Sequence, residues 1–181
     1  MTSFDLAIGR GTLRQLHTSL ANHAPAQAVT ILQEAGYAAG EAIYKAFATW
    51  LPEHTGVDSP GNLDADLLAE TLSEFFTSGG WGTVAMTPVG TGALAVDSND
   101  WAEAEPASAQ SPMCFFTAGM LADFLGRLSA ETVAVMEVEC RSRGDSRCRF
   151  LAGAPDTLSA LYDRMAQGVG YADALGLSSS T

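Results

Sequence analysis

All three cysteines of this 181-residue chain fall between residues 114 and 148, together with an acid at a suggestive position. Cys114 stands in SPMCFFTAGML, and Glu137, Cys140 and Cys148 stand in EVECRSRGDSRCRF. A disulfide would leave one thiol over and would not explain the acid. Buried, unreactive thiols that pack as small hydrophobic groups are a second interpretation. A zinc site is the third, because three thiolates and one carboxylate can fill a tetrahedron. Such a closed site would stabilise structure and leave no position for chemistry.

The fourth ligand of such a site is ambiguous. In a regular strand Glu137 and Cys140 point to opposite faces, so both can reach one ion only if the strand ends or bulges near Val138 or Glu139. Glu139 is therefore the rival ligand. Four arginines crowd the same segment and could offset the negative charge of the ligands, although surface arginines on a hairpin would look the same: Arg141, Arg143, Arg147 and Arg149.

The hydrophobic pattern changes from helical to strand-like along the chain, which indicates an α+β fold. Helices are expected over 12–51, 64–76, 114–129 and 156–175, and strands over 83–89, 92–98, 131–140 and 147–153, paired as two hairpins. Residues 52–62 are expected to form a loop, and the acidic stretch 99–111 an exposed loop that could serve as a lid. Gly36 and Gly40 favour close helix–helix contact or a kink over a ligand lying against bare backbone.

No linker divides the chain, so a single domain over 1–181 is expected. It comprises a helical part (1–64), a core with the zinc site (65–152), a C-terminal helix (153–175) and a frayed tail (176–181).

Composition excludes several classes of partner. The chain has 21 acidic and 9 basic residues and a net charge of −12, which argues against nucleic acid and against anionic membrane surfaces. No apolar run is long enough for a spanning helix, and the N-terminus has no signal-peptide pattern. The odd number of cysteines fits a reducing cytoplasm better than a secreted scaffold.

Residues 65–152, above all WGTVAMTPV and the run from SPMCFFTAGML to RCRF, resemble the 4-vinyl reductase domain. This hydrocarbon-binding family includes sensory domains of phenol- and xylene-responsive activators and an accessory protein of bacteriochlorophyll synthesis. The resemblance implies a structural zinc bound by Cys114, Glu137, Cys140 and Cys148, and so favours Glu137 over Glu139. It also implies the fold of vesicle-tethering subunits and haem-based gas sensors, with about four antiparallel strands and flanking helices, and a homodimer.

The resemblance further implies an apolar pocket bounded by the helices, the strands and the segment after Cys114. For any one aromatic or sulfur-bearing side chain, an ordinary core position is an equally valid interpretation. The sensory domains hold a phenol hydroxyl with a His and a Trp, which cannot be assigned here among His17, His23 and His54. The candidate pocket residues are Tyr37, Tyr44, Phe47, Trp50, Phe76, Trp81, Met86, Phe116, Met120 and Phe124.

Motifs for catalysis are weak. GRG at 9–11 and GTG at 90–92 lack the third glycine and the strand–helix setting of a dinucleotide site, and three cysteines cannot supply a four-thiolate iron–sulfur cluster. The sequence therefore favours a non-catalytic, zinc-stabilised binding protein for a hydrophobic or aromatic small molecule, as sensor or carrier. The alternatives are an accessory protein of tetrapyrrole synthesis that binds a vinyl-bearing porphyrin, and a purely structural or interaction protein.

Overall fold

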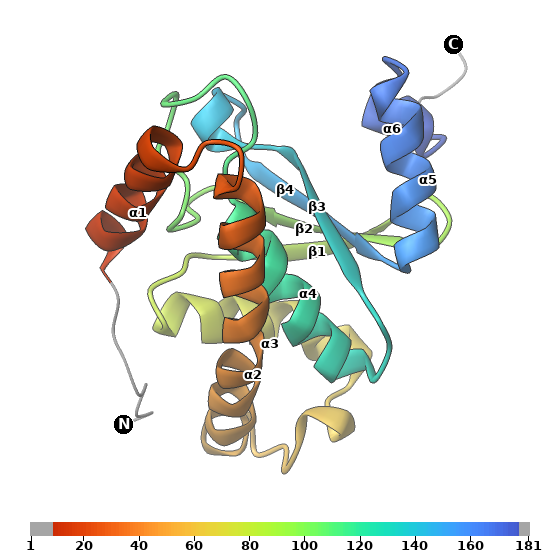
Figure 1. The fold of residues 1–181 in the computed structure, drawn as a ribbon. Coiled ribbons are helices and arrows are strands. Elements are labelled where there is room, and N and C mark those ends of the chain that lie inside the picture. The colour runs from red at the N-terminus through yellow and green to blue at the C-terminus, as the bar shows by residue number, and fades with distance from the viewer. Residues whose placement is uncertain (1–8, 178–181) are drawn as a thin grey trace.

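The computed structural model describes residues 9–177 and has the expected α+β architecture (Figure 1). Short 3₁₀ turns lie at Pro60–Asn62 and Arg141–Arg143. The helices are α1 (Arg10–His23), α2 (Ala28–Thr55), α3 (Ala65–Ser78), α4 (Phe115–Ser129), α5 (Pro155–Ala166) and α6 (Tyr171–Ala174). The strands are β1 (Ala85–Val89), β2 (Ala93–Ser98), β3 (Ala134–Glu139) and β4 (Cys148–Gly153).

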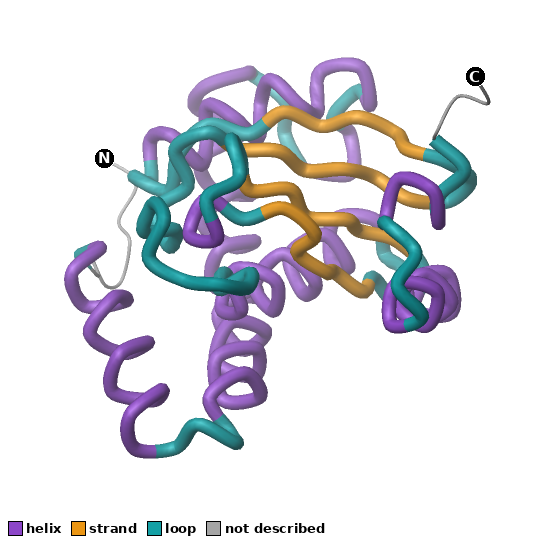
Figure 2. The backbone as a smooth tube through the Cα atoms, turned by 90° about the horizontal axis from the view of Figure 1, so that it is seen from above, coloured by secondary structure: helices purple, strands orange, loops and turns teal. Residues whose placement is uncertain are grey.

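The four strands form one antiparallel sheet in the order β1-β2-β4-β3 (Figure 2). Both expected hairpins are present, and they join through β2 and β4. That pairing places Ser98 opposite Cys148 and Val96 opposite Phe150. The two hairpins, separated in sequence by α4, therefore form one continuous surface.

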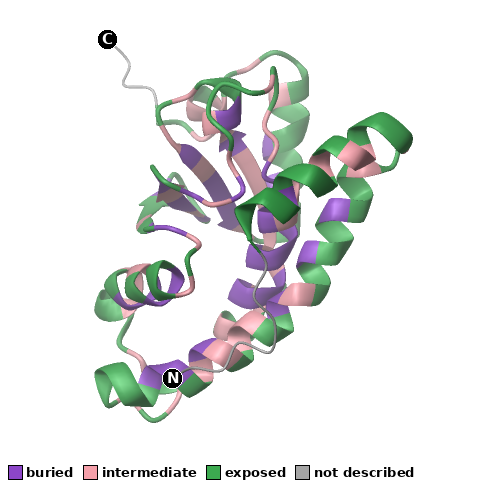
Figure 3. Ribbon diagram, turned by 90° about the vertical axis from the view of Figure 1, so that its left-hand side faces the viewer, coloured by how far each residue is buried: buried purple, intermediate pink, exposed green. Residues whose placement is uncertain are grey.

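Each face of the sheet is covered by helices because side chains alternate along the strands. Val96, Phe150 and Ala152 pack with α2, α3 and α4 in the larger hydrophobic cluster, which contains most of the aromatic rings and all three cysteines. Ala95 and Leu151 face the opposite way and pack with α5 in a smaller cluster. Figure 3 shows the buried residues concentrated on the sheet and on the inner faces of the helices.

α2 and α4 cross at very short distance, as the glycine spacing predicted. A Cβ atom on Gly36 would lie 1.9 Å from the carbonyl oxygen of Phe116, and one on Gly119 would lie 2.0 Å from that of Gln33. Gly40 makes the same kind of approach to Asp123. Only glycine allows these backbones to come so close.

Three expectations about element boundaries were wrong. α2 continues through Pro52 to Thr55, because a proline in the last turn costs one hydrogen bond and Gly56, with a φ of 74°, then ends the helix. The loop after β2 is not exposed throughout, since Trp101 and Glu103 are buried. The C-terminal helix is two helices, α5 and α6, separated at Gly168 (φ 87°).

Residues 178–181 of the expected tail lie outside the described residues. None of the helices within 9–177 combines the length and the hydropathy that crossing a lipid bilayer requires.

Candidate metal centre and aromatic core

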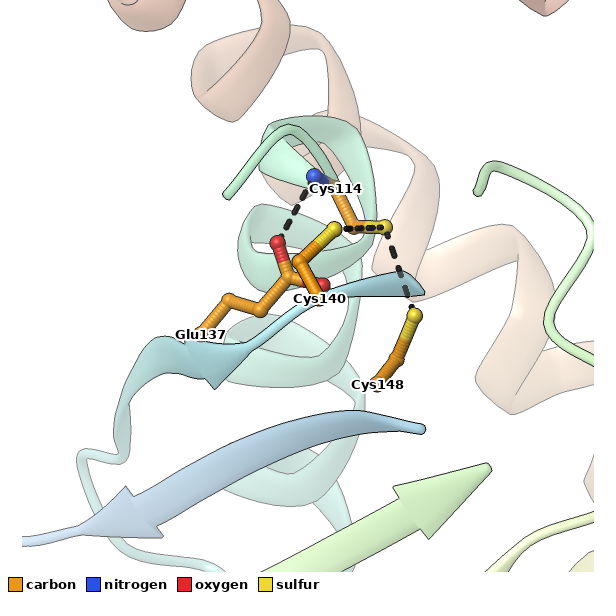
Figure 4. A group of neighbouring side chains, drawn as sticks. All are labelled: Cys114, Glu137, Cys140 and Cys148. Atoms are coloured by element: carbon orange, nitrogen blue, oxygen red, sulfur yellow. Dashed lines mark hydrogen bonds between the residues drawn. The ribbon is translucent and has the colours of Figure 1, made fainter. Parts of the chain in front are cut away.

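The three cysteines and Glu137 converge at one end of the sheet (Figure 4). Cys114 is the N-cap residue of α4, Glu137 lies in β3, Cys140 directly follows β3, and Cys148 begins β4. The candidate ligand atoms of all four lie within 4.8 Å of one another. The expected convergence is therefore present, and all three thiols are buried.

The sulfur–sulfur distances distinguish between the interpretations of the cysteines. Cys114 Sγ lies 3.8 Å from Cys140 Sγ and 3.9 Å from Cys148 Sγ. A disulfide requires about 2.05 Å. Tetrahedral zinc with Zn–S bonds of about 2.3 Å places its sulfurs about 3.8 Å apart. The three thiols therefore have the spacing of metal ligands.

Glu137 is directed into this cluster by a bulge in β3. It pairs with Phe150, whereas Glu139 pairs with Arg149, so the strand register shifts between the two acids. The backbone N–H of Cys114 donates to Glu137 Oε2 at 2.9 Å. Glu137 Oε1 is buried and, within residues 9–177, has no hydrogen-bond partner. An unsatisfied buried carboxylate oxygen beside three thiols is what a fourth ligand to a cation would present.

Glu139 lies on the opposite side of the strand. Its carboxylate accepts hydrogen bonds from Arg147 at 2.8 and 3.1 Å, and it also bonds Tyr171. Arg149 forms a two-pronged ion pair with Asp97, with both distances 2.7 Å. The arginines thus neutralise neighbouring carboxylates and contact the ligand cluster only through the strands between them.

Proton affinities in the cluster also favour a cation. Burial, together with the charge of Cys140, raises the pKa of Glu137 to about 8. Hydrogen bonds from Cys114 and Cys148 lower the pKa of Cys140, while the same interaction raises the pKa of Cys114. Without a cation the buried cluster retains protons at neutral pH. A divalent ion would replace them.

The aromatic side chains gather beside the cluster, between α2, α3 and α4. Phe47 contacts Phe75 and Phe124 edge to face, with ring centroids 5.1 and 5.8 Å apart. Trp50 lies against Phe75 at 5.6 Å and stacks on His54 at 4.1 Å. Trp50 Nε1 is buried and, like Glu137 Oε1, has no partner among the described residues. A hydrogen-bond donor therefore sits unused inside an aromatic cluster.

Most candidate pocket residues share this region. Phe47, Trp50, Phe76, Met120 and Phe124 are buried in it, and Tyr44, Trp81, Met86 and Phe116 pack partly buried around it. Tyr37 lies elsewhere, 56% exposed. It borders a shallow outer groove of about 290 Å³ with Gln33, Glu34, Ala118, Gly119, Ala122 and Val135.

The sequence interpretation missed Trp101 and Glu103. Trp101 packs on Phe76 and Trp81 and donates from Nε1 to Thr117 Oγ1 at 2.7 Å. Glu103 is buried at the start of α4. A tryptophan within the polar stretch NDWAEAE was the available signal, because so large an apolar ring is rarely left in water.

Comparison with known proteins agrees with this geometry. The family model of the 4-vinyl reductase domain matches residues 97–154, which include all four cluster residues, and confirms the resemblance found in the sequence. The phenol-responsive sensory domain of the transcription activator PoxR, crystallised with phenol, is structurally similar. The TM-score is 0.59 at 18% identity over 82% of this chain and 75% of that one, which confirms the fold.

A vinyl-4-reductase family protein from Methanocaldococcus jannaschii aligns over 67% of this chain and 66% of its own, with 22% identity and a TM-score of 0.45. No curated protein matches the chain.

Proposed function

We propose that this chain is a zinc-stabilised binding protein for a small, neutral aromatic or hydrophobic molecule, which it senses or carries. The observation that carries the proposal is the unpartnered indole N–H of Trp50 within a shell of aromatic rings. A buried donor without a partner is costly, and a ligand oxygen would satisfy it. The similar fold of a domain described as phenol-responsive supports the same class of ligand.

The metal in this proposal is structural. Cys114, Glu137, Cys140 and Cys148 would hold zinc, and a bound zinc would supply a cross-link between three chain segments. Those segments are the start of α4, the end of β3 and the start of β4, which meet the aromatic core in one hydrophobic cluster. Four protein ligands fill the tetrahedron, so the residues support cohesion of the binding site rather than catalysis.

The aromatic core indicates the ligand's chemistry. Phe75 meets Phe47 and Trp50 edge to face at 5.1 and 5.6 Å, and an aromatic ring fits between such partners. A net charge of −12 disfavours anionic ligands. The rings already contact one another, so a monocyclic ligand needs only a small outward movement, whereas a tetrapyrrole needs a much larger one.

The test combines metal analysis with thermal unfolding. We expect about one zinc per chain, lost in Cys140→Ser, and a melting temperature that rises with phenol and cresols but not with benzoate. Trp50→Phe should keep the zinc and lose most of the phenol-induced rise. Trp81→Phe, a partly buried tryptophan at the edge of the cluster, is the matched control and should retain it.

The opposite results would decide against the proposal. A chain that carries no metal and stays folded in chelator rules out the zinc. A melting temperature indifferent to neutral aromatic compounds rules out the ligand class. A Soret band in the purified protein would support the tetrapyrrole alternative instead. We also expect a cytoplasmic homodimer, and light scattering on the purified chain tests the dimer.

A further inference from the structure

Glu103, a residue that the zinc site and the aromatic core leave without a function, forms a buried junction at the start of α4. Its side chain is 0% exposed. Oε1 accepts the backbone N–H of Phe116 at 3.0 Å, and Oε2 accepts that of Thr117 at 2.8 Å as well as the Thr117 hydroxyl. A buried carboxylate with this many donors is held firmly in place.

This carboxylate does the work of a helix cap for α4. Cys114 occupies the N-cap position but its side chain makes no capping hydrogen bond. Glu103 supplies the missing acceptor for the first turn from a distant loop, at the positive end of the helix dipole. Because Cys114 immediately precedes that turn, Glu103 helps to hold the first metal ligand in position.

The same carboxylate anchors α1. His17 Nε2 lies 2.8 Å from Glu103 Oε1, and the His17 side chain is 12% exposed. The other attachments of α1 are weak: Leu13 is its one buried residue, and Arg14 pairs with Glu105 at the surface with a separation of 3.3 Å. Figure 1 shows α1 beside the loop that follows β2, away from the sheet. His17 is thus the main internal tie of this helix.

We propose that α1 is a latch whose docking through His17 on Glu103 is coupled to occupancy of the metal site at Cys114. A cation that binds Cys114 orders the first turn of α4, and the ordered turn holds Glu103 where His17 can reach it. Linkage requires the reverse effect of the same size, so a docked α1 must also tighten metal binding. The inference rests on the metal part of the proposed function and needs no small molecule.

Three single variants test the coupling. His17→Ala removes the contact, and Glu103 keeps its three bonds to α4, so the fold should persist. His17→Gln retains a donor and should restore part of the contact. His23→Ala changes an exposed histidine in the last turn of the same helix and serves as the control.

Two measurements apply to each variant: zinc affinity by competition with a chromophoric chelator, and hydrogen exchange of residues 10–23 with and without zinc. We expect His17→Ala to weaken zinc binding about 5- to 10-fold, with His17→Gln intermediate and His23→Ala unchanged. Zinc removal should speed exchange in α1 of the wild type. In His17→Ala that exchange should be fast whether or not zinc is present.

Each contrary result has a distinct meaning. A wild type that binds zinc while its α1 exchange ignores the metal overturns the coupling and leaves the proposed function intact. Equal zinc affinity in wild type and His17→Ala does the same. A wild type that binds no zinc overturns the metal site and the latch together.

Discussion

At the scale of single residues, two acids two positions apart have opposite environments. Glu137 faces three buried thiols, while Glu139 faces Arg147 and Tyr171 on the other side of the strand. Burial alone would raise the pKa of Glu139, but the hydrogen bonds from Arg147 and Tyr171 hold it below its usual value. The bulge in β3 is what separates the two roles.

The raised pKa of Glu137 predicts a pH dependence that changes sign with zinc. A carboxyl group with a raised folded-state pKa stabilises the fold below its unfolded value near 4.3, and this contribution is lost as pH rises through about 8. Metal-free protein should therefore lose a few kcal/mol over that range. Glu137→Gln should flatten the loss, as measured by urea unfolding in chelator.

Zinc binding should show the reverse, with affinity falling as the pH is lowered, because the ion must displace the proton. Calorimetry at pH 7 in buffers of different ionisation enthalpy should detect about one proton fewer released by Glu137→Gln than by wild type. Glu139→Gln is the matched control and should release the wild-type number. Equal release by all three proteins would contradict the assignment of Glu137 as a ligand.

At the scale of elements, the α2–α4 crossing determines where the core lies. The close backbone approach at Gly36 and Gly119 brings Phe47 and Trp50 of α2 against Phe124 of α4 and the rings of α3. The glycine spacing was visible in the sequence and its interpretation as a close crossing was right. The partner helix was not predictable, because glycine spacing carries no information about what approaches it.

Substitution at the crossing should therefore be severe. Gly36→Ala would place a Cβ 1.9 Å from the Phe116 carbonyl oxygen, so the helices must separate. We expect a loss of about 3 kcal/mol in the free energy of unfolding. Gly11→Ala, in open space on α1, should stay within about 0.5 kcal/mol of wild type. Chemical denaturation of both variants makes the comparison, and equal stabilities would exclude the tight crossing.

At the scale of the whole molecule, the sheet separates two structures built on the same strands. One face carries the metal cluster and the aromatic core, and the other carries the charge network of Asp97, Glu139, Arg147 and Arg149. Tyr171 of α6 closes that network through Glu139 and Arg149. The C-terminal helices are thus attached to the back of the strands that supply the metal ligands.

Loss of the Tyr171 hydroxyl should loosen that attachment. We expect Tyr171→Phe to cost about 1 to 2 kcal/mol and to speed hydrogen exchange in residues 171–174, with zinc content unchanged. Tyr162→Phe, whose ring is 62% exposed on α5, should behave as wild type. If the two variants have the same exchange rates, the network does not hold α6.

The sequence alone determined what depends on local pattern. Periodicity predicted the α+β order of elements, and the spacing of three sulfurs and two acids predicted a four-ligand site together with a bulge near Val138. Tertiary structure decided what depends on contacts between distant segments. It selected Glu137 over Glu139, left Trp50 without a partner and buried Glu103 between His17 and α4. A residue's type and spacing reflect its own helix or strand, whereas its neighbours across the fold are set by packing of the whole chain.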